Sequence, residues 1–565
     1  MVEEAIILED SDELIDINEN FKLTAGPGSG KTRFLINHIK NVINSSDKLK
    51  NGSKIACITH TNIAVDTIKE RLGTSTLEVE VNTIHHFLYK HVVKPYLWII
   101  NGEMDINFNS FPMKQCFPSN RLLPKQFSWV WNDKGQEHIF NILRKLNWGF
   151  DGEHNLYVKQ IGIQEVPYDF LDEYKKNCWE NGLISPEDIL YFSYKIIVKN
   201  PKILNILRIK FPYLFLDEFQ DTNYLQNEII KFLANSGIKL GIIGDYAQSI
   251  YKFQGSELES FLNFRINEDL KQYELRNNHR SNVNIVNILN HIRRDDFKQK
   301  SLQKKQNFKI TPTIIIGDEI EAYNKTKSLL KTENFYSLSY KSSKINGLKF
   351  KLTNGENIKY ISEDEINTIF NSDSTYHRRL IIRYTILAIE SFRIEKINEA
   401  IKYMKFAYKK FDFDNYKAIK DLYRLNSEYD NFKQLSITDF YNNFIYGYYN
   451  VKFQIRNQKH SKVKENYDKY TYLDFSLNLY NQPNDLKFRT IHSCKGQEFD
   501  NVALFLEKEI DLDFLLNPNI IENETHRVYY VALSRAKENF IINTPKLDNE
   551  NEKFLKNIGF DIIAL

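Results

Sequence analysis

The chain has 565 residues, of which 42% are hydrophobic and 26% are charged, ordinary values for a globular protein. Its 76 Lys and Arg residues nearly balance its 73 Asp and Glu residues, and the net charge of +3 excludes a protein that is basic overall. Any nucleic-acid contact must therefore come from local grooves. The four cysteines argue against zinc, iron–sulfur and disulfide frameworks because they stand far apart, at Cys57, Cys116, Cys178 and Cys494.

The N-terminus predicts a protein that stays inside the cell. MVEEAIILEDSDELID is acidic, whereas a signal peptide begins with basic residues, and no apolar run approaches the ~18 residues of a membrane span. We therefore expect a cytoplasmic protein without membrane contact, and the length predicts about three or four domains.

The stretch LTAGPGSGKTRF, residues 23–34, has the pattern of a phosphate-binding loop. Glycines allow backbone N–H groups to curl around phosphate oxygens, and the helix that follows adds its N-terminal dipole. We expect Lys31 to reach the β- and γ-phosphates of a nucleotide and Thr32 to bind Mg²⁺. The loop has alanine where the strict pattern has glycine, and its residues are Ala25, Gly26, Pro27, Gly28, Ser29 and Gly30.

Short apolar runs typical of buried strands recur along the chain, at residues 54–59, 213–218, 239–245, 501–507 and 540–545. Helical patterns lie between several of them, as in residues 61–72 and 225–235. Buried strands that alternate with amphipathic helices predict an α/β fold with parallel sheets covered on both faces. Ligands of such sheets bind at the carboxyl ends of the strands.

Two long stretches interrupt this alternation. Residues 90–180 contain all five tryptophans and little strand signal, and residues 352–485 are helical in pattern and rich in Tyr, Phe and Lys. Aromatic clusters of this kind are more often core than ligand platforms. The expected segments are 1–89 and 181–257 for a first α/β domain, 258–351 and 486–565 for a second, and 90–180 and 352–485 for two mainly helical insertions.

The segment YLFLDEFQDTNYLQ, residues 213–226, is an apolar strand that ends in two adjacent carboxylates. Beside a phosphate loop, Asp217 is expected to hold Mg²⁺ through its water shell, and Glu218 to orient or deprotonate the attacking water. The same pair is also compatible with a cap for the next helix. Its combination with the loop favours hydrolysis of a nucleoside triphosphate.

The segment GIIGDYAQSIYKFQGS, residues 241–256, ends another strand close to polar and aromatic residues. Gln248 is placed to respond to a γ-phosphate, and Tyr251 and Phe253 are placed to stack on a base, although Phe253 fits a core position equally well. Arg280 and Arg535 are candidates for the positive charge that hydrolysis needs, which accelerates the reaction by about 10³–10⁵. A single arginine is more often a surface residue.

Eight segments in order resemble the motifs of the superfamily 1 helicases of the UvrD/Rep/PcrA type: TAGPGSGKT, ITHTNIAVDTI, VNTIHHF, FLDEFQDTN, IIGDYAQSIYKFQG, LRNNHRS, FRTIHSCKGQEFDNV and YYVALSRAK. They span residues 24–537, whereas the two insertions resemble the family weakly. The resemblance implies two RecA-like P-loop domains with ATP and Mg²⁺ in the cleft between them. It also implies single-stranded or partly duplex DNA across the top and 3′→5′ stepping driven by cleft closure.

The resemblance assigns roles by position. The matches to the family's catalytic residues are Lys31, Asp217, Glu218, Gln248, Arg280 and Arg535. Thr32 and Asp217 match the metal-binding positions, Arg33 and His279 the base-contacting positions, and Glu498 the position that contacts the nucleotide sugar. The matches to DNA-contacting positions are Thr59, His60, Asn62, His85, Tyr251, Phe253, Thr490 and His492.

Several residues depart from the family pattern. SDELIDINENFK, upstream of the phosphate loop, lacks the adenine-reading glutamine, so the residues do not define selectivity for ATP over other triphosphates. His279 replaces the usual tyrosine, and its smaller ring stacks less extensively on adenine. His60 and Ile84 replace usual phenylalanines and Gln254 a usual arginine, which weakens base stacking and the grip on DNA.

Three functions remain compatible with these residues. The first is an ATP-dependent 3′→5′ DNA helicase or translocase. The second is a DNA-sensing ATPase subunit that regulates a separate nuclease with little unwinding, as in the compact UvrD-like subunit of Gabija anti-phage systems. A short second insertion, the changed stacking residues and a chain that ends soon after Arg535, without room for a fused nuclease, favour it. The third is a P-loop ATPase whose turnover ignores single-stranded DNA.

Overall fold

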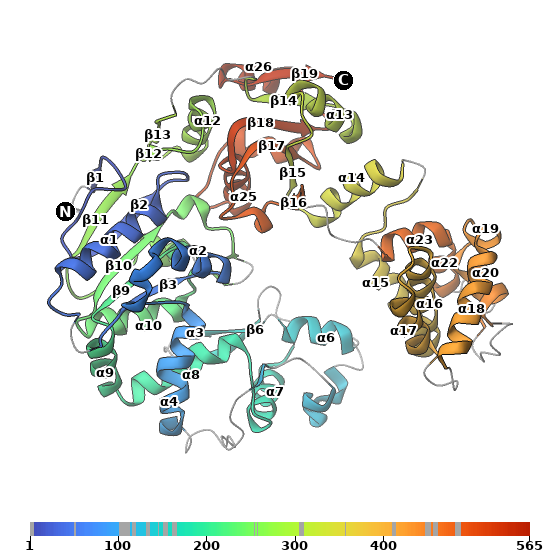
Figure 1. Ribbon diagram of the computed structural model, residues 1–565, viewed down its shortest axis with the longest axis horizontal. Helices are drawn as coiled ribbons and strands as arrows, with labels where there is room; N and C mark the ends of the chain where they lie inside the picture. The colour runs from blue at the N-terminus through green and yellow to red at the C-terminus, as the bar shows by residue number, and fades with distance from the viewer. Residues whose placement is uncertain are drawn as a thin grey trace.

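Two parallel sheets organise the computed structural model, and helical segments extend from both (Figure 1). The structure describes residues 5–565 except for 50–51, 101–113, 116–119, 131–135, 145, 151–155, 161–165, 253–254, 257, 304–309, 356–357, 409–413, 447–453, 456–461 and 481–486. Phe253, Gln254 and Cys116 therefore lie outside the described residues.

The first sheet carries the phosphate loop and is entirely parallel. In spatial order its described strands are β1 (Ile6–Leu8), β11 (Leu270–Leu275), β2 (Asn20–Ala25), β10 (Lys239–Gly244), β9 (Tyr213–Leu216), β3 (Ile55–Thr59) and β4 (Val79–Thr83). The helices that accompany it are α1 (Lys31–Ser45), α2 (Asn62–Leu72), α8 (Pro186–Lys199), α9 (Lys202–Lys210), α10 (Tyr224–Asn235) and α11 (Leu258–Leu262).

The strand β9 illustrates why this sheet is covered on both faces. Successive side chains of a strand point to opposite sides. Tyr213 and Phe215 accordingly pack into the core formed with α1 and α2, whereas Leu214 and Leu216 pack into the core formed with α8 and α10. All four residues are buried, and the continuous apolar run correctly predicted a central parallel strand.

The second sheet is also parallel, which confirms the predicted α/β class. Its described strands are, in spatial order, β16 (Phe488–Thr490), β15 (Tyr336–Ser339), β17 (Phe499–Phe505), β18 (Ala536–Thr544), β14 (Thr313–Ile316) and β19 (Asp561–Ala564). The helices that accompany it are α12 (Val283–Arg293), α13 (Glu319–Leu330), α14 (Ser342–Asn354), α24 (Asp513–Leu516), α25 (Glu524–Leu533) and α26 (Asn549–Asn557). A short pair, β12 (Asn277–Asn278) and β13 (Lys300–Ser301), lies between the two sheets in sequence and in Figure 1.

The position of β11 differs from the expected segment border after residue 257. This strand lies inside the first sheet, where it pairs with β2 on one side and β1 on the other. Its sequence LKQYEL alternates polar and apolar residues, and several of its side chains are only partly buried. It therefore lacks the continuous apolar run by which β3, β9, β10, β17 and β18 were recognised.

The insertion after β4 combines helices with short strands that the sequence did not reveal. Its described elements are α3 (Ile84–Leu88), α4 (Lys94–Tyr96), β5 (Lys114–Gln115), α6 (Gln136–Leu143), β6 (Leu146–Phe150), β7 (Leu156–Gln160), α7 (Tyr168–Glu180) and β8 (Leu183–Ile184). The expected aromatic core holds for Trp148 and Trp179, which are buried and stacked with ring centroids 6.0 Å apart. Trp98 and Trp129 are exposed instead, and Trp131 lies outside the described residues.

The second insertion is helical and has its own apolar core (Figure 1, right). Its described helices are α15 (Glu363–Ser372), α16 (Tyr376–Arg393), α17 (Ile397–Ala407), α18 (Asn415–Ser427), α19 (Tyr429–Phe432), α20 (Ile437–Phe440), α22 (Lys462–Asp468) and α23 (Tyr472–Leu479). In the described part of the chain, no helix has both the length and the apolar character that a membrane span requires.

Candidate nucleotide site and nucleic-acid interface

The phosphate loop joins β2 to α1, and two of its glycines adopt positive φ angles. Gly28 and Gly30 have φ angles of 70° and 88°, a left-handed conformation that strains residues with a Cβ. Ser29 closes the loop, because its hydroxyl donates to the carbonyl of Gly26 at 2.8 Å. Gly30 is the N-cap of α1 and presents no side chain to the first amides of the helix. These amides are therefore left for an anion.

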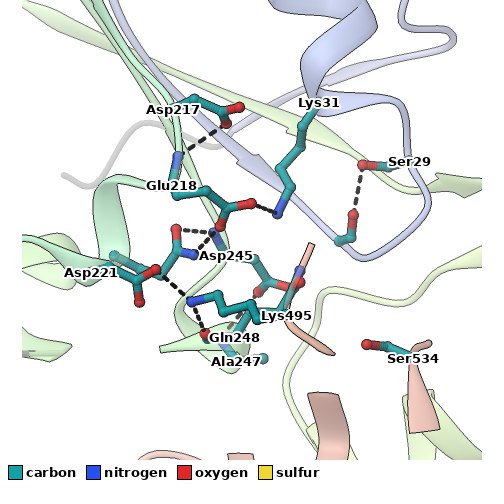
Figure 2. Close-up of polar contacts among 12 residues, drawn as sticks. Ser29, Lys31, Asp217, Glu218, Asp221, Asp245, Ala247, Gln248, Lys495 and Ser534 are labelled. Carbon is teal, nitrogen blue, oxygen red and sulfur yellow. Dashed lines mark hydrogen bonds and ion pairs between the residues drawn. The ribbon is translucent and has the colours of Figure 1, made fainter. Parts of the chain in front are cut away.

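Lys31 points from α1 toward the carboxylates that follow β9 (Figure 2). Its Nζ lies 3.8 Å from Oε1 of Glu218, yet this buried atom makes no hydrogen bond within the described residues. Glu218 is held at φ 54°, and Asp217 accepts a hydrogen bond from the Glu218 amide at 3.0 Å. A buried ammonium without a hydrogen-bond acceptor, next to the uncapped first amides of α1, fits a phosphate group.

The two carboxylates have opposite pKa shifts. Burial, and then the charge of Glu218, raise the pKa of Asp217. Burial acts on Glu218 as well, but Lys31 and then Lys495 outweigh it and lower the pKa of this residue. Glu218 therefore ionises more readily than Asp217 does. A metal ion beside Asp217 would restore the charge of that carboxylate.

Gln248 lies where residues from both sheets meet. It ends the short helix η7 (Tyr246–Gln248) after β10, and its Nε2 donates to Oδ2 of Asp245 at 2.8 Å. Its Oε1 accepts a hydrogen bond at 3.2 Å from Arg535, which follows α25. Burial, and then the nearby Arg280, lower the pKa of Arg535. This buried cation is therefore well placed to receive an anion.

Arg280 reaches the edge of the same site from the segment after β12. It donates to Glu498 at 2.7 Å and to the carbonyl of Ser534 at 3.0 Å. A Cβ at Gly28 would lie 2.6 Å from Cβ of Arg280, so glycine also allows this segment to approach the phosphate loop. Asn278 and Gln299 donate to the carbonyl of Pro27 at 2.9 and 3.0 Å.

Arg33 and His279, the residues expected to contact a base, are exposed. Arg33 forms a two-point ion pair with Asp12, and Asn37 donates to the same carboxylate at 2.6 Å. The amide of His279 donates to the carbonyl of Gly28 at 2.9 Å. The residues before the loop therefore supply a carboxylate beside Arg33, in the region where the sequence lacks the family's glutamine.

Four of the expected DNA contacts come together in one cluster. His60, after β3, stacks on Tyr251 with ring centroids 5.3 Å apart and planes at 7°. His492 lies 6.4 Å from Tyr251, and His85 is close enough to His60 to influence its pKa. Burial is the main cause that lowers the pKa of His60, which favours a neutral ring that stacks.

The remaining expected DNA contacts are more dispersed. Thr59 ends β3, and its buried Oγ1 has no hydrogen-bond partner in the part of the chain that the structure describes. Asn62 is exposed at the first turn of α2, and Thr490 ends β16 and accepts a hydrogen bond from the amide of Ser493 at 3.4 Å. Phe253 falls outside the described residues.

Lys495 connects the nucleotide site to this cluster and was not recognised from the sequence. Its Nζ donates to Asp221 and, at 2.8 Å, to the carbonyl of Gln248, and it lies 4.7 Å from the ring centroid of Tyr251. Gln220 was also missed; it donates to Glu218 and accepts from the amide of Asp245 at 3.1 Å. The only sequence signal for either residue was its place inside a motif.

Two family models match separate parts of the chain. The UvrD/REP helicase N-terminal domain matches residues 10–269, and the UvrD-like helicase C-terminal domain matches residues 476–546. Together they span more than half of the chain and include Lys31, Glu218 and Arg535. The chain belongs to the UvrD/REP helicase family.

The relatives of this chain match it over different shares of its length. The chain is 24% identical to the Gabija protein GajB of Bacillus cereus (strain HuB5-5) over 93% of each chain. It is 28% identical to DNA helicase II of Haemophilus influenzae over 48% of this chain and 38% of the other. For the ATP-dependent DNA helicase PcrA of Bacillus subtilis the identity is 27%, over 49% and 38%.

The chemistry of the site fits a nucleotide with magnesium, which UvrD-like helicases use. In the described residues no three His, Cys, Asp or Glu side chains cluster as ligands of a metal ion. Mg²⁺ usually binds one or two carboxylates together with water and substrate phosphates, so a single acidic ligand is sufficient. Thr32, at the start of α1, and Asp217 are the residues that would hold it.

Proposed function

We propose that this UvrD-like helicase hydrolyses ATP between its two sheets and uses the cycle to move 3′→5′ along single-stranded DNA. The observation that carries the proposal is the environment of Gln248. This residue of the first sheet's segment is bound by Arg535 and Lys495, which both belong to the second sheet's segment. The nucleotide site is thus complete only when both segments contribute to it.

Each residue has a distinct part in the proposed reaction. The amides of Gly28 and of residues 30–32 and the Nζ of Lys31 hold the phosphates, while Thr32 and Asp217 hold Mg²⁺, which supplies positive charge to the β- and γ-phosphates. Glu218 orients the attacking water and accepts its proton. Gln248 contacts the γ-phosphate. The guanidinium groups of Arg280 and Arg535 stabilise the negative charge that develops on this phosphate during the reaction.

Coupling to DNA is proposed to pass through Lys495. A base stacked near His60 and Tyr251 would lie against the same side chain that binds the carbonyl of Gln248. A shift of Lys495 on DNA binding would therefore move the backbone beside the proposed γ-phosphate contact. This arrangement supports hydrolysis that responds to single-stranded DNA.

The direction of movement is tested by strand displacement with two duplexes, one with a 3′ single-stranded tail and one with a 5′ tail. We expect ATP-dependent displacement of the 3′-tailed duplex only. The matched control is Lys31→Ala, which should bind DNA without displacing either strand. Displacement confined to the 5′-tailed duplex would overturn the polarity.

A second candidate function is favoured by the similarity to the Gabija protein GajB over 93% of both chains. In this alternative the chain is a DNA-sensing ATPase subunit that regulates a partner nuclease in anti-phage defence. It predicts DNA-stimulated ATP hydrolysis without strand displacement, and altered nuclease activity when the two proteins are combined. Robust unwinding by the isolated chain would exclude it.

A further inference from the structure

A buried ion pair joins the two sheets behind Gln248. Arg293, the last residue of α12, donates from Nη1 to Oδ1 of Asp245 at 2.7 Å, and neither side chain is more than 1% exposed. Asp245 directly follows β10 of the first sheet, whereas α12 packs against β18 and α25 of the second. The charge pair therefore crosses from one sheet's segment to the other.

Further contacts fix the guanidinium group in place. Its Nε lies 3.0 Å from both carboxylate oxygens of Asp295, which also accepts a hydrogen bond from the hydroxyl of Tyr246. Its Cζ lies 4.1 Å from the ring centroid of Phe297 and 4.9 Å from that of Tyr246. Tyr246 belongs to the first sheet's segment and Asp295 to the second, so this polar contact crosses as well.

Asp245 in turn sets the orientation of Gln248. Both oxygens of an ionised carboxylate only accept hydrogen bonds, so the amide nitrogen of Gln248 must face Asp245. The amide oxygen is then turned toward Arg535. Because Oδ1 of Asp245 is bound by Arg293 and by the amide of Ala247, the carboxylate cannot rotate without breaking these bonds.

Stability alone does not explain a charge pair at this place. Replacing a buried ion pair by apolar residues of similar volume is often neutral or stabilising, because burial of the two charges costs solvation. We propose that Arg293 is a positioning residue for ATP hydrolysis. Arg293 holds Asp245, and Asp245 in turn holds Gln248 in the orientation that contacts the γ-phosphate. Because Arg293 and Asp245 belong to the segments of different sheets, this orientation is set only when the two sheets are correctly placed. This inference rests on the proposed function, since it requires ATP turnover at this site.

The test compares Arg293→Met with Arg294→Met. Arg294 is the adjacent residue and is exposed, so it controls for the loss of one arginine from the same helix end. We expect Arg293→Met to lower kcat for DNA-stimulated ATP hydrolysis by about 10- to 100-fold, as for a misplaced catalytic group, while KM for ATP changes less than about twofold. Arg294→Met should keep the wild-type kcat.

The outcomes separate this inference from the proposed function. Wild-type kcat in a folded Arg293→Met variant overturns the inference alone, as does an equal change of kcat in both variants. Absence of ATP turnover in the wild-type protein overturns the proposed function and the inference with it. If Arg293→Met does not fold, Asp245→Asn/Arg293→Met replaces it, because the fully buried carboxylate of Asp245 is then not left without its cation. That double variant should fold and lose kcat, and wild-type kcat in it would contradict the role.

Discussion

Glu218 combines a strained backbone with an unusually acidic side chain. A residue with a Cβ at φ 54° costs about 1–3 kcal/mol, and such strain persists where the surrounding structure imposes it. The left-handed conformation at the end of β9 places the carboxylate opposite Lys31. The strain therefore serves the placement of the group that we propose to orient water.

Glu218→Gln and Lys31→Ala test the reacting end of the site. Each should lower kcat for ATP hydrolysis by at least about 10²-fold, because each removes a charge aimed at the reacting groups. Binding of single-stranded DNA, measured by fluorescence anisotropy, should stay close to wild type. Wild-type turnover in either variant would refute the assignment of this site.

Tyr251→Ala tests the stacking cluster. Loss of one aromatic platform should weaken DNA binding by about 1–3 kcal/mol and raise the DNA concentration needed for half-maximal stimulation. Hydrolysis without DNA should change little. Tyr251→Phe keeps the ring and is the matched control, which should behave like wild type. Equal loss of basal and stimulated hydrolysis in the alanine variant would assign Tyr251 to the core instead.

At the scale of elements, the segment from β10 to Tyr251 lies beside the proposed sites of both the nucleotide, at Gln248, and single-stranded DNA, at Tyr251. Lys495 holds this segment through the carbonyl of Gln248 and pairs with Asp221, and both of these charged side chains are buried. Removing one partner of such a pair destabilises a protein by about 3–5 kcal/mol, because the other charge stays buried and unpaired.

Lys495→Met should therefore lower the urea midpoint of unfolding, and Asp221→Asn/Lys495→Met should recover most of the loss. Both variants should lose DNA stimulation, since neither can link Tyr251 to Gln248. These changes are read from urea titrations and from ATPase assays with and without DNA. Normal stimulation in the stable double variant would show that the coupling takes another path.

The elements differ in how well the sequence predicted them. The apolar runs that became β3, β9, β10, β17 and β18 were recognisable because buried parallel strands need continuous hydrophobic residues. The strand β11 escaped because polar and apolar residues alternate in it and most are only partly buried, and β6 (LNWGF) escaped because asparagine and glycine interrupt its apolar residues. Arg293 and Gln220 could not be predicted, since their roles depend on neighbours far away in the sequence.

At the scale of the whole molecule, polar contacts between the segments of the two sheets surround the candidate nucleotide site. The phosphate loop is held by Asn278 and Gln299, and Gln248 by Arg535. ATP and DNA are therefore expected to act on the same interface. Both proposed functions, movement with unwinding and the sensing of DNA, would use this interface.

Both proposed functions require ATP hydrolysis that is stimulated by single-stranded DNA, so this dependence is the most direct quantity to measure. ATP hydrolysis by the full chain should be measured across a titration of single-stranded DNA, with Lys31→Ala as the control. We predict Mg²⁺-dependent turnover that rises with single-stranded DNA and is lost in the control. Turnover that is indifferent to DNA, or that survives in Lys31→Ala, would contradict a DNA-coupled ATPase at this site.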